Sequence, residues 1–138
     1  MADPKTYVNI EKLAVKDVFD SKYKTSLLPI IQKAAEKAVK ASKLTTDEPK
    51  EKGAKGYTLD GTIVSLGPDK SGKNLKGECS LVISTWPGKS VKAMPSGNAA
   101  IGIDDPAKID AGDVEAVAEA AVKSAMESAT KYMEKNAP

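Results

Sequence analysis

The chain has 138 residues, of which 41% are apolar and 29% charged, and its net charge is +2. This composition is typical of one folded domain, which we predict over residues 1–138, and it excludes a disordered or membrane-embedded chain. There is no histidine and no arginine, so all 21 positive side chains are lysine. A Ser-His-Asp triad, a Cys-His pair, a histidine zinc site or an arginine phosphate clamp therefore cannot be built from this chain alone.

The charges are distributed unevenly along the chain. Residues 1–56 hold twelve lysines against eight acids, residues 57–103 five against three, and residues 104–138 four against eight. The first part is therefore net positive and the last part net negative, so opposite ends of one chain, or of neighbouring copies, attract each other at short range. The overall charge is too small to indicate a nucleic-acid partner.

Residues 8–19 are predicted to be extended. Their apolar residues first occupy even-numbered positions and then, from Leu13, odd-numbered ones. A strand that changes its alternation in this way contains a break or a β-bulge, because one extra residue moves the later side chains to the other face. We place this irregularity near Glu11 and Lys12.

The next segment has the features of a helix. Ser26 is a suitable N-cap, and Pro29 falls in the first turn, where its missing N–H does no harm. Apolar residues then recur every three or four positions until about Lys43, with lysines on the opposite side. Residues 45–56 are polar, charged and interrupted by proline and glycine, which predicts a mobile loop.

Three strands are predicted after this loop, over residues 57–66, 78–86 and 91–103, because polar and apolar residues alternate in each. Pro87 and Gly88 form a turn signal, so the second and third strands should run antiparallel. A Pro-Ser-Gly segment interrupts the third strand, which indicates an edge strand or a bulge.

A second helix is the clearest element of the chain. Asp110 is its predicted cap, and Asp113 lies in the first turn, where negative charge suits the helix dipole. A wide apolar face follows at helical spacing as far as Tyr132. The element order is β-α-β-β-β-α. We predict an α+β fold in which two long helices pack on one face of an antiparallel sheet of three to four strands.

The segment Gly67–Asn74 (GPDKSGKN) nearly matches the phosphate-binding loop G-x-x-x-x-G-K-[ST]. Asn74 replaces the hydroxyl that would bind magnesium. Only three residues separate the segment from the next strand, which leaves no room for a helix whose N-terminus holds phosphate. We favour a hairpin loop kept soluble by Lys70, Lys73 and Lys76 over nucleotide binding.

An acidic cluster is formed by Asp104, Asp105, Asp110, Asp113 and Glu115. It lacks the spacing of an EF-hand, and an acidic helix N-terminus explains most of it. We therefore predict no metal site and no cofactor. The lysine face of the first helix offers charge to nucleic acid, but the strands lack an aromatic platform for bases, so a solvated helix face is favoured.

The predicted strand over residues 78–86 directs Cys79 to one face and Val82 and Trp86 to the other. If helices cover Cys79 and its apolar neighbours, Val82 and Trp86 lie on an uncovered face. An exposed apolar patch often marks a partner surface, so Val82 and Trp86 are the predicted interaction residues. The alternatives are that the N-terminal strand or the long loop covers this face, or that Cys79 is on the exposed side. No histidine can activate Cys79, and no catalytic residue is predicted.

The stretch Gly56–Leu66 (GYTLDGTIVSL) has the form y-x-l-x-G-x-v-x-x-l. A second strand, the turn Pro87–Lys89, a strand ending in the small residues Ser96–Ala100 and an alanine-rich helix follow it. This order resembles the small α/β domains of bacterial envelope assembly proteins, such as the TolB N-terminal domain and the related CsgG and LpoB lipoprotein domains. The resemblance covers residues 7–135 and implies binding to other proteins without catalysis. No diagnostic motif is shared, so no functional residue is transferred.

These observations predict a non-enzymatic domain for protein interaction or assembly, whose partner is another protein or a second copy. The alternative is a protein that binds a small ligand or a metal ion through the hairpin loop or the acidic cluster. No window approaches the roughly 20 apolar residues of a membrane span. Met1–Lys5 lacks the apolar run of a signal peptide. The sequence is compatible with a cytoplasmic protein and with the mature form of a periplasmic protein whose signal peptide has been removed.

Overall fold

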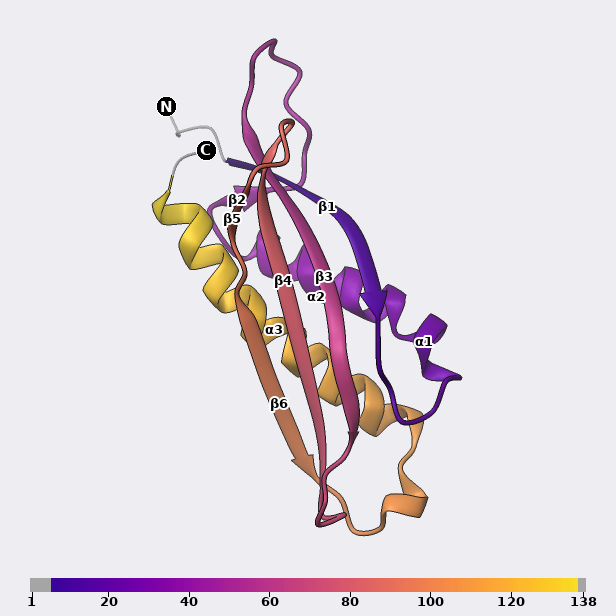
Figure 1. Ribbon diagram of the computed structural model, residues 1–138. Coiled ribbons are helices and arrows are strands. Elements are labelled where there is room, and N and C mark those ends of the chain that lie inside the picture. Colours follow the sequence, from indigo (N-terminus) through magenta and orange to yellow (C-terminus); the bar gives the residue numbers. More distant parts are fainter. Residues whose placement is uncertain (1–5, 137–138) are drawn as a thin grey trace.

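The computed structural model describes residues 6–136, so Met1–Lys5, on which the signal-peptide argument rests, lies outside the described residues. Figure 1 shows a long, twisted sheet with helices behind it. In chain order the elements are β1 (Thr6–Val15), α1 (Tyr23–Ser26), α2 (Leu28–Lys40), β2 (Leu44–Thr45), β3 (Gly56–Pro68), β4 (Asn74–Trp86), β5 (Val91–Ala93), β6 (Ser96–Gly102), a 3₁₀ turn (Pro106–Lys108) and α3 (Ala111–Lys135).

The sheet has six strands and mixes both strand directions. Strand β1 is parallel to β2 on one side and to β3 on the other, whereas the pairs β3–β4, β4–β5 and β4–β6 are antiparallel. The predicted antiparallel sheet of three to four strands is therefore too small, and its single strand direction is wrong. Parallel strands need a crossover of a dozen or more residues, here the segment with α1 and α2, and apolar alternation does not reveal strand direction.

Helices α2 and α3 both lie behind the sheet, where they pack against each other and against one face (Figure 1). This part of the predicted fold is confirmed. Gly97 of β6 lies so close to α3 that a Cβ there would come within 2.3 Å of the Ala125 nitrogen. The largest fully buried side chains come from the sheet and from one stripe of each helix: Val8, Leu27, Ile31, Leu44, Tyr57, Leu59, Ile63, Leu75, Leu81, Ile83, Met126 and Met133.

The starts of the two long helices differ in how well the sequence predicts them. Asp110 caps α3 as predicted: its side chain accepts from the Asp113 N–H, and the Asp113 side chain accepts from the Asp110 N–H. The predicted Ser26 cap of α2 is wrong, because the short helix α1 precedes it and Leu27 occupies the cap position. The Ser26 hydroxyl instead donates to the Tyr23 carbonyl oxygen.

The irregularities predicted in two strands are both present. Strand β1 changes register against β3 between Ile10 and Leu13, as the alternation indicated. The segment predicted as one strand over residues 91–103 is two strands, β5 and β6, separated by Met94 and Pro95. Strand β4 therefore pairs with β5 near its C-terminal end and with β6 along its N-terminal half, so these two strands form one edge of the sheet.

Candidate functional site

The face of the sheet away from α2 and α3 has no described element over it, and we name it the open face (Figure 1). Strand β4 places Cys79 and Leu81 toward the helices, where they are buried, and Val82 and Trp86 on the open face, where they are partly exposed. The predicted register of this strand is confirmed. The outward residues that define the open face are Tyr7, Asn9, Thr58, Asp60, Thr62, Ser65, Lys76, Glu78, Ser80, Val82, Ser84, Trp86, Asn98 and Ala100.

Trp86 packs against Tyr7 at one end of the open face. Their ring centroids are 4.7 Å apart and their planes meet at 75°, which is an edge-to-face pair. Gly56 lies between them in the sheet, and a Cβ there would come within 2.5 Å of the Tyr7 carbonyl oxygen. The two rings therefore meet across a glycine of the middle strand, and the N-terminal strand covers part of Trp86.

The surroundings of Val82 and Trp86 are polar. Thr58 and Ser84 lie on the same face and are only 1% and 5% exposed. The Thr58 hydroxyl has no hydrogen-bond partner among the described residues. The open face is thus rich in hydroxyl groups and has an aromatic pair at one corner, so the predicted apolar residues Val82 and Trp86 lie among polar ones.

One ion pair reaches across the open face. Glu11, in the bulge of β1, and Lys89, in the turn after β4, meet at 2.6 Å between Oε1 and Nζ. The hydrogen bond that Lys89 donates to the Glu11 carboxylate raises the pKa of Lys89. Beside it, the Lys12 N–H donates to the Asp60 carboxylate at 3.0 Å. These residues were not identified from the sequence as part of the surface. The predicted bulge was a signal for them, because a bulge changes the direction of the side chains beside it.

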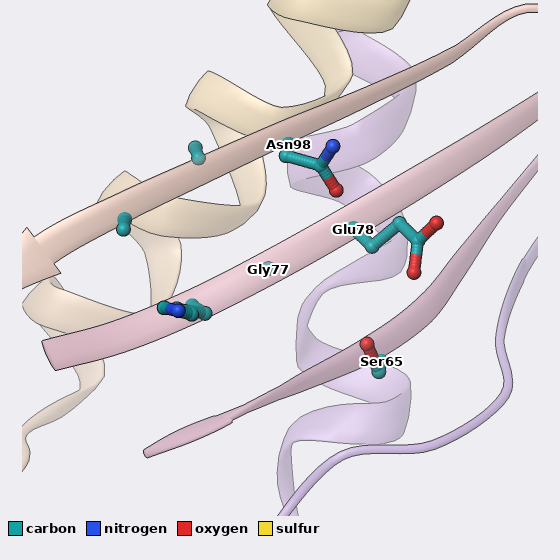
Figure 2. Close-up of a pocket in the computed structure, with 7 residues that line it drawn as sticks. Ser65, Gly77, Glu78 and Asn98 are labelled. Carbon is teal, nitrogen blue, oxygen red and sulfur yellow. The ribbon is translucent and has the colours of Figure 1, made fainter. Parts of the chain in front are cut away.

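A shallow hollow of about 460 Å³ lies at the other end of the open face. Figure 2 shows Ser65, Glu78 and Asn98 side by side along it, one from each of β3, β4 and β6. They are direct cross-strand neighbours, whereas Gly77 on the next position faces the helix layer, where a Cβ would come within 2.8 Å of the Val117 side chain. One carboxylate, one hydroxyl and one amide can hydrogen-bond a polar group, but this set alone provides no nucleophile activated by a base.

The glycine-rich segment over residues 67–74 forms the hairpin connection between β3 and β4. Asn74 is the first residue of β4, so a strand and not a helix follows Lys73. The Asp69 carboxylate accepts from the Ser71 hydroxyl at 2.6 Å and from the Asn74 amide at 3.1 Å, and these bonds lower the pKa of Asp69 to about 2. The loop is closed by its own polar groups and lacks the helix N-terminus that binds phosphate in the motif it resembles.

The acidic side chains before and at the start of α3 accept hydrogen bonds from nearby backbone N–H groups. Asp105 accepts from the Ala107 N–H at 2.9 Å, and Asp110 and Asp113 form the capping box of α3. Within residues 6–136, no three Cys, Asp or Glu side chains are grouped so as to hold a metal ion. Cys79 is fully buried, and burial raises the pKa of its thiol to about 11, so it stays protonated at neutral pH.

None of the helices over residues 6–136 is long and apolar enough to cross a membrane. No family model matches the chain, and no curated protein matches it either. Among solved structures, the chain is similar to protein XCC0632 from Xanthomonas campestris, which is described by the family model DUF330. The TM-score is 0.60 at 12% sequence identity, and the similarity covers 95% of this chain and 85% of that chain. At this identity the similarity shows a shared fold.

Proposed function

We propose that the protein is a non-enzymatic interaction domain that binds another protein or a second copy of itself through its sheet. The observation that carries this proposal is the open face. Among residues 6–136, the helices cover one side of the six-stranded sheet, and the single tryptophan of the chain lies on the other side. Tryptophan is enriched among the residues that dominate protein interfaces, and Val82 lies on the same face of the same strand as Trp86.

The chemistry of the open face favours binding over catalysis. The chain has no histidine, and Cys79 is buried on the opposite face. The hollow beside Glu78 is lined by this carboxylate, by the charged side chain of Lys76 and by neutral hydrogen-bonding side chains. Hydroxyl and amide groups at one end and an aromatic pair at the other suit a partner surface that is partly polar and partly apolar.

Site-specific photo-crosslinking tests this proposal. A benzophenone amino acid at Val82, on the open face, should form covalent adducts with a defined protein in cells that produce the chain. The same amino acid at Lys33, exposed on α2, is the matched control and should form far fewer. Adding Trp86→Ser should reduce the Val82 adducts, while circular dichroism remains that of the folded domain.

Two outcomes would remove the open face from consideration. One is equal crosslinking from Val82 and Lys33. The other is unfolding of the Trp86→Ser variant, because truncation of a core tryptophan costs about 3–5 kcal/mol and Trp86 would then be a structural residue.

A further inference from the structure

Strand β6 is an edge of the sheet without the usual protection. It pairs with β4 on one side, and no described strand pairs with its other side. Proteins commonly protect such an edge with charged side chains, with proline or with a bulge. The seven residues of β6 (SGNAAIG) contain no charge and no proline, and they pair with β4 in unbroken register.

The opposite edge of the sheet is different. Strand β2 has only two residues, Leu44 and Thr45, so it offers little backbone to a partner. Beyond it, β1 carries its bulge with Glu11 and Lys12. Short strands, charges and bulges are the devices that prevent edge pairing, and β6 lacks all three.

The hydrogen bonds of β4 determine which backbone groups of the β6 edge face outward. The Leu81 N–H donates to the Pro95 carbonyl oxygen, and the Ile103 N–H donates to the Lys73 carbonyl oxygen. Because bonded and non-bonded pairs alternate in an antiparallel ladder, the odd-numbered residues of β6 bond to β4. The residues that direct their N–H and C=O groups outward are therefore Ser96, Asn98, Ala100 and Gly102.

We propose that β6 pairs antiparallel with β6 of a second copy of this chain, so that two sheets join into one. With Ala99 opposite Ala99, Ser96 lies opposite Gly102 and Asn98 opposite Ala100. Every outward-facing residue of one copy then meets an outward-facing residue of the other, and their backbone groups bond. Such a contact is self-complementary, as a twofold interface requires, and the small side chains cause no clash.

The segments that flank β6 support a second copy as the partner. Met94, just before β6, is 67% exposed, and Lys92 of β5 is exposed as well. Asp104, just after β6, is exposed and carries the opposite charge. Antiparallel pairing places the start of one β6 beside the end of the other, so Lys92 lies near Asp104 of the second copy and Met94 gains cover. The positive charge of Lys92 and the negative charge of Asp104 then attract each other across the interface.

Helix α3 leaves room for the same arrangement. Its flank toward α2 carries charged side chains, among them Glu119 and Lys123. The other side, where Ser124 approaches Gly97 of β6, has Ala120 and Ser128 one turn before and after Ser124. Small side chains at these positions would let the α3 helices of two copies approach each other closely.

This inference rests on the proposed function and names its partner, and analytical ultracentrifugation tests it. The wild-type chain should form a dimer as concentration rises. The combined variant Asn98→Lys and Ala100→Lys should be monomeric at the same concentrations, because the lysines of the two copies would face each other. These residues also belong to the open face, so Val82→Asp, on β4, is the companion variant and should remain dimeric. Asn98 and Ala100 are both exposed, so the circular dichroism of the lysine variant should remain that of the folded domain. The control Ser21→Lys with Thr25→Lys adds the same charge at exposed positions away from β6 and should remain dimeric.

A disulfide crosslink tests the register. In the proposed pairing, Ala99 of the two copies forms a non-hydrogen-bonded pair with Cα atoms about 4.5 Å apart, which is within disulfide range. Ala99→Cys should therefore give a covalent dimer under mild oxidation, whereas Val91→Cys should not. Cys79 is buried and does not interfere.

A wild-type chain that stays monomeric at the highest concentration reached would overturn the inference, as would a dimer that persists in the double lysine variant or the lack of an Ala99→Cys crosslink. If Val82→Asp abolishes dimerisation and the lysine variant does not, the open face binds the second copy. The inference then fails while the proposed function stands. Absence of both Val82 crosslinking and dimerisation would contradict the two proposals together.

Discussion

Alternate residues of strand β4 point to its two faces, and the two sets of side chains have very different environments. Leu81 is 1% exposed beneath the helices, whereas Val82, the next residue, remains partly exposed on the open face. Cys79 and Ile83 are fully buried, while Glu78 and Ser80 face outward. The alternation of a strand separates two sets of side chains, and only the helix layer decides which set becomes the core.

The open face also shows how a polar surface can be buried without a covering layer. Thr58 is as inaccessible as the core residues, although it faces away from the helices. It lies between Asn9 of β1 and Ser84 of β4 in the sheet, and the ion pair of Glu11 and Lys89 reaches across the same end of the face. No described helix or strand lies over this face, so we infer that neighbouring side chains of the sheet exclude solvent from Thr58.

The largest expected effect on the free energy of unfolding comes from truncating Leu81, and it is measured against truncation of the adjacent Val82 on the other face. Leu81→Ala should lower the free energy of unfolding by about 2–5 kcal/mol, because it leaves a cavity under the helices. Val82→Ala removes a partly exposed side chain and should cost about 1 kcal/mol or less. Urea denaturation of both variants measures the difference. Equal losses would mean that the open face is packed as tightly as the core.

A smaller effect, of opposite sign, is expected at Thr58. Its buried hydroxyl has no hydrogen-bond partner within residues 6–136, and an unsatisfied buried hydroxyl costs about 1–3 kcal/mol. Thr58→Val should therefore raise the free energy of unfolding by about 1 kcal/mol. Thr62→Val is the matched control, because Thr62 lies on the same strand and face but remains accessible to water. Destabilisation by Thr58→Val, relative to this control, would show that the hydroxyl is needed.

The smallest effect is expected from the ion pair of Glu11 and Lys89. Lys89→Met keeps the aliphatic stem and removes the charge, so stability should fall slightly at low salt and not at high salt, because exposed charges are screened. The pKa of Lys89 is raised in the folded state, so its contribution is complete below the ordinary lysine pKa of 10.5 and is lost as pH rises through the folded value. Lys70→Met, at an exposed lysine of the loop between β3 and β4, is the control. A salt-independent loss would assign the effect to packing of the stem.

Several local features were predictable because neighbouring residues determine them. The capping box of Asp110 and Asp113 depends on residues three apart, and the bulge of β1 follows from a change in alternation within one strand. The Ser26 cap failed because a four-residue helix, too short for periodicity to detect, precedes α2. The candidate surface was predicted only in part: Val82 and Trp86 lie on the face expected, but the polar residues around them are brought together from separate strands.

By itself, the amino-acid sequence determined the two long helices and the division of the β4 side chains between two faces, because spacing along one chain dictates which side chains share a face. Only the tertiary structure decided that β1 runs parallel to β3, that Tyr7 meets Trp86 across Gly56, and that β6 remains an unprotected edge. Strand order and direction depend on which distant segments pair, and side-chain alternation is the same for either direction.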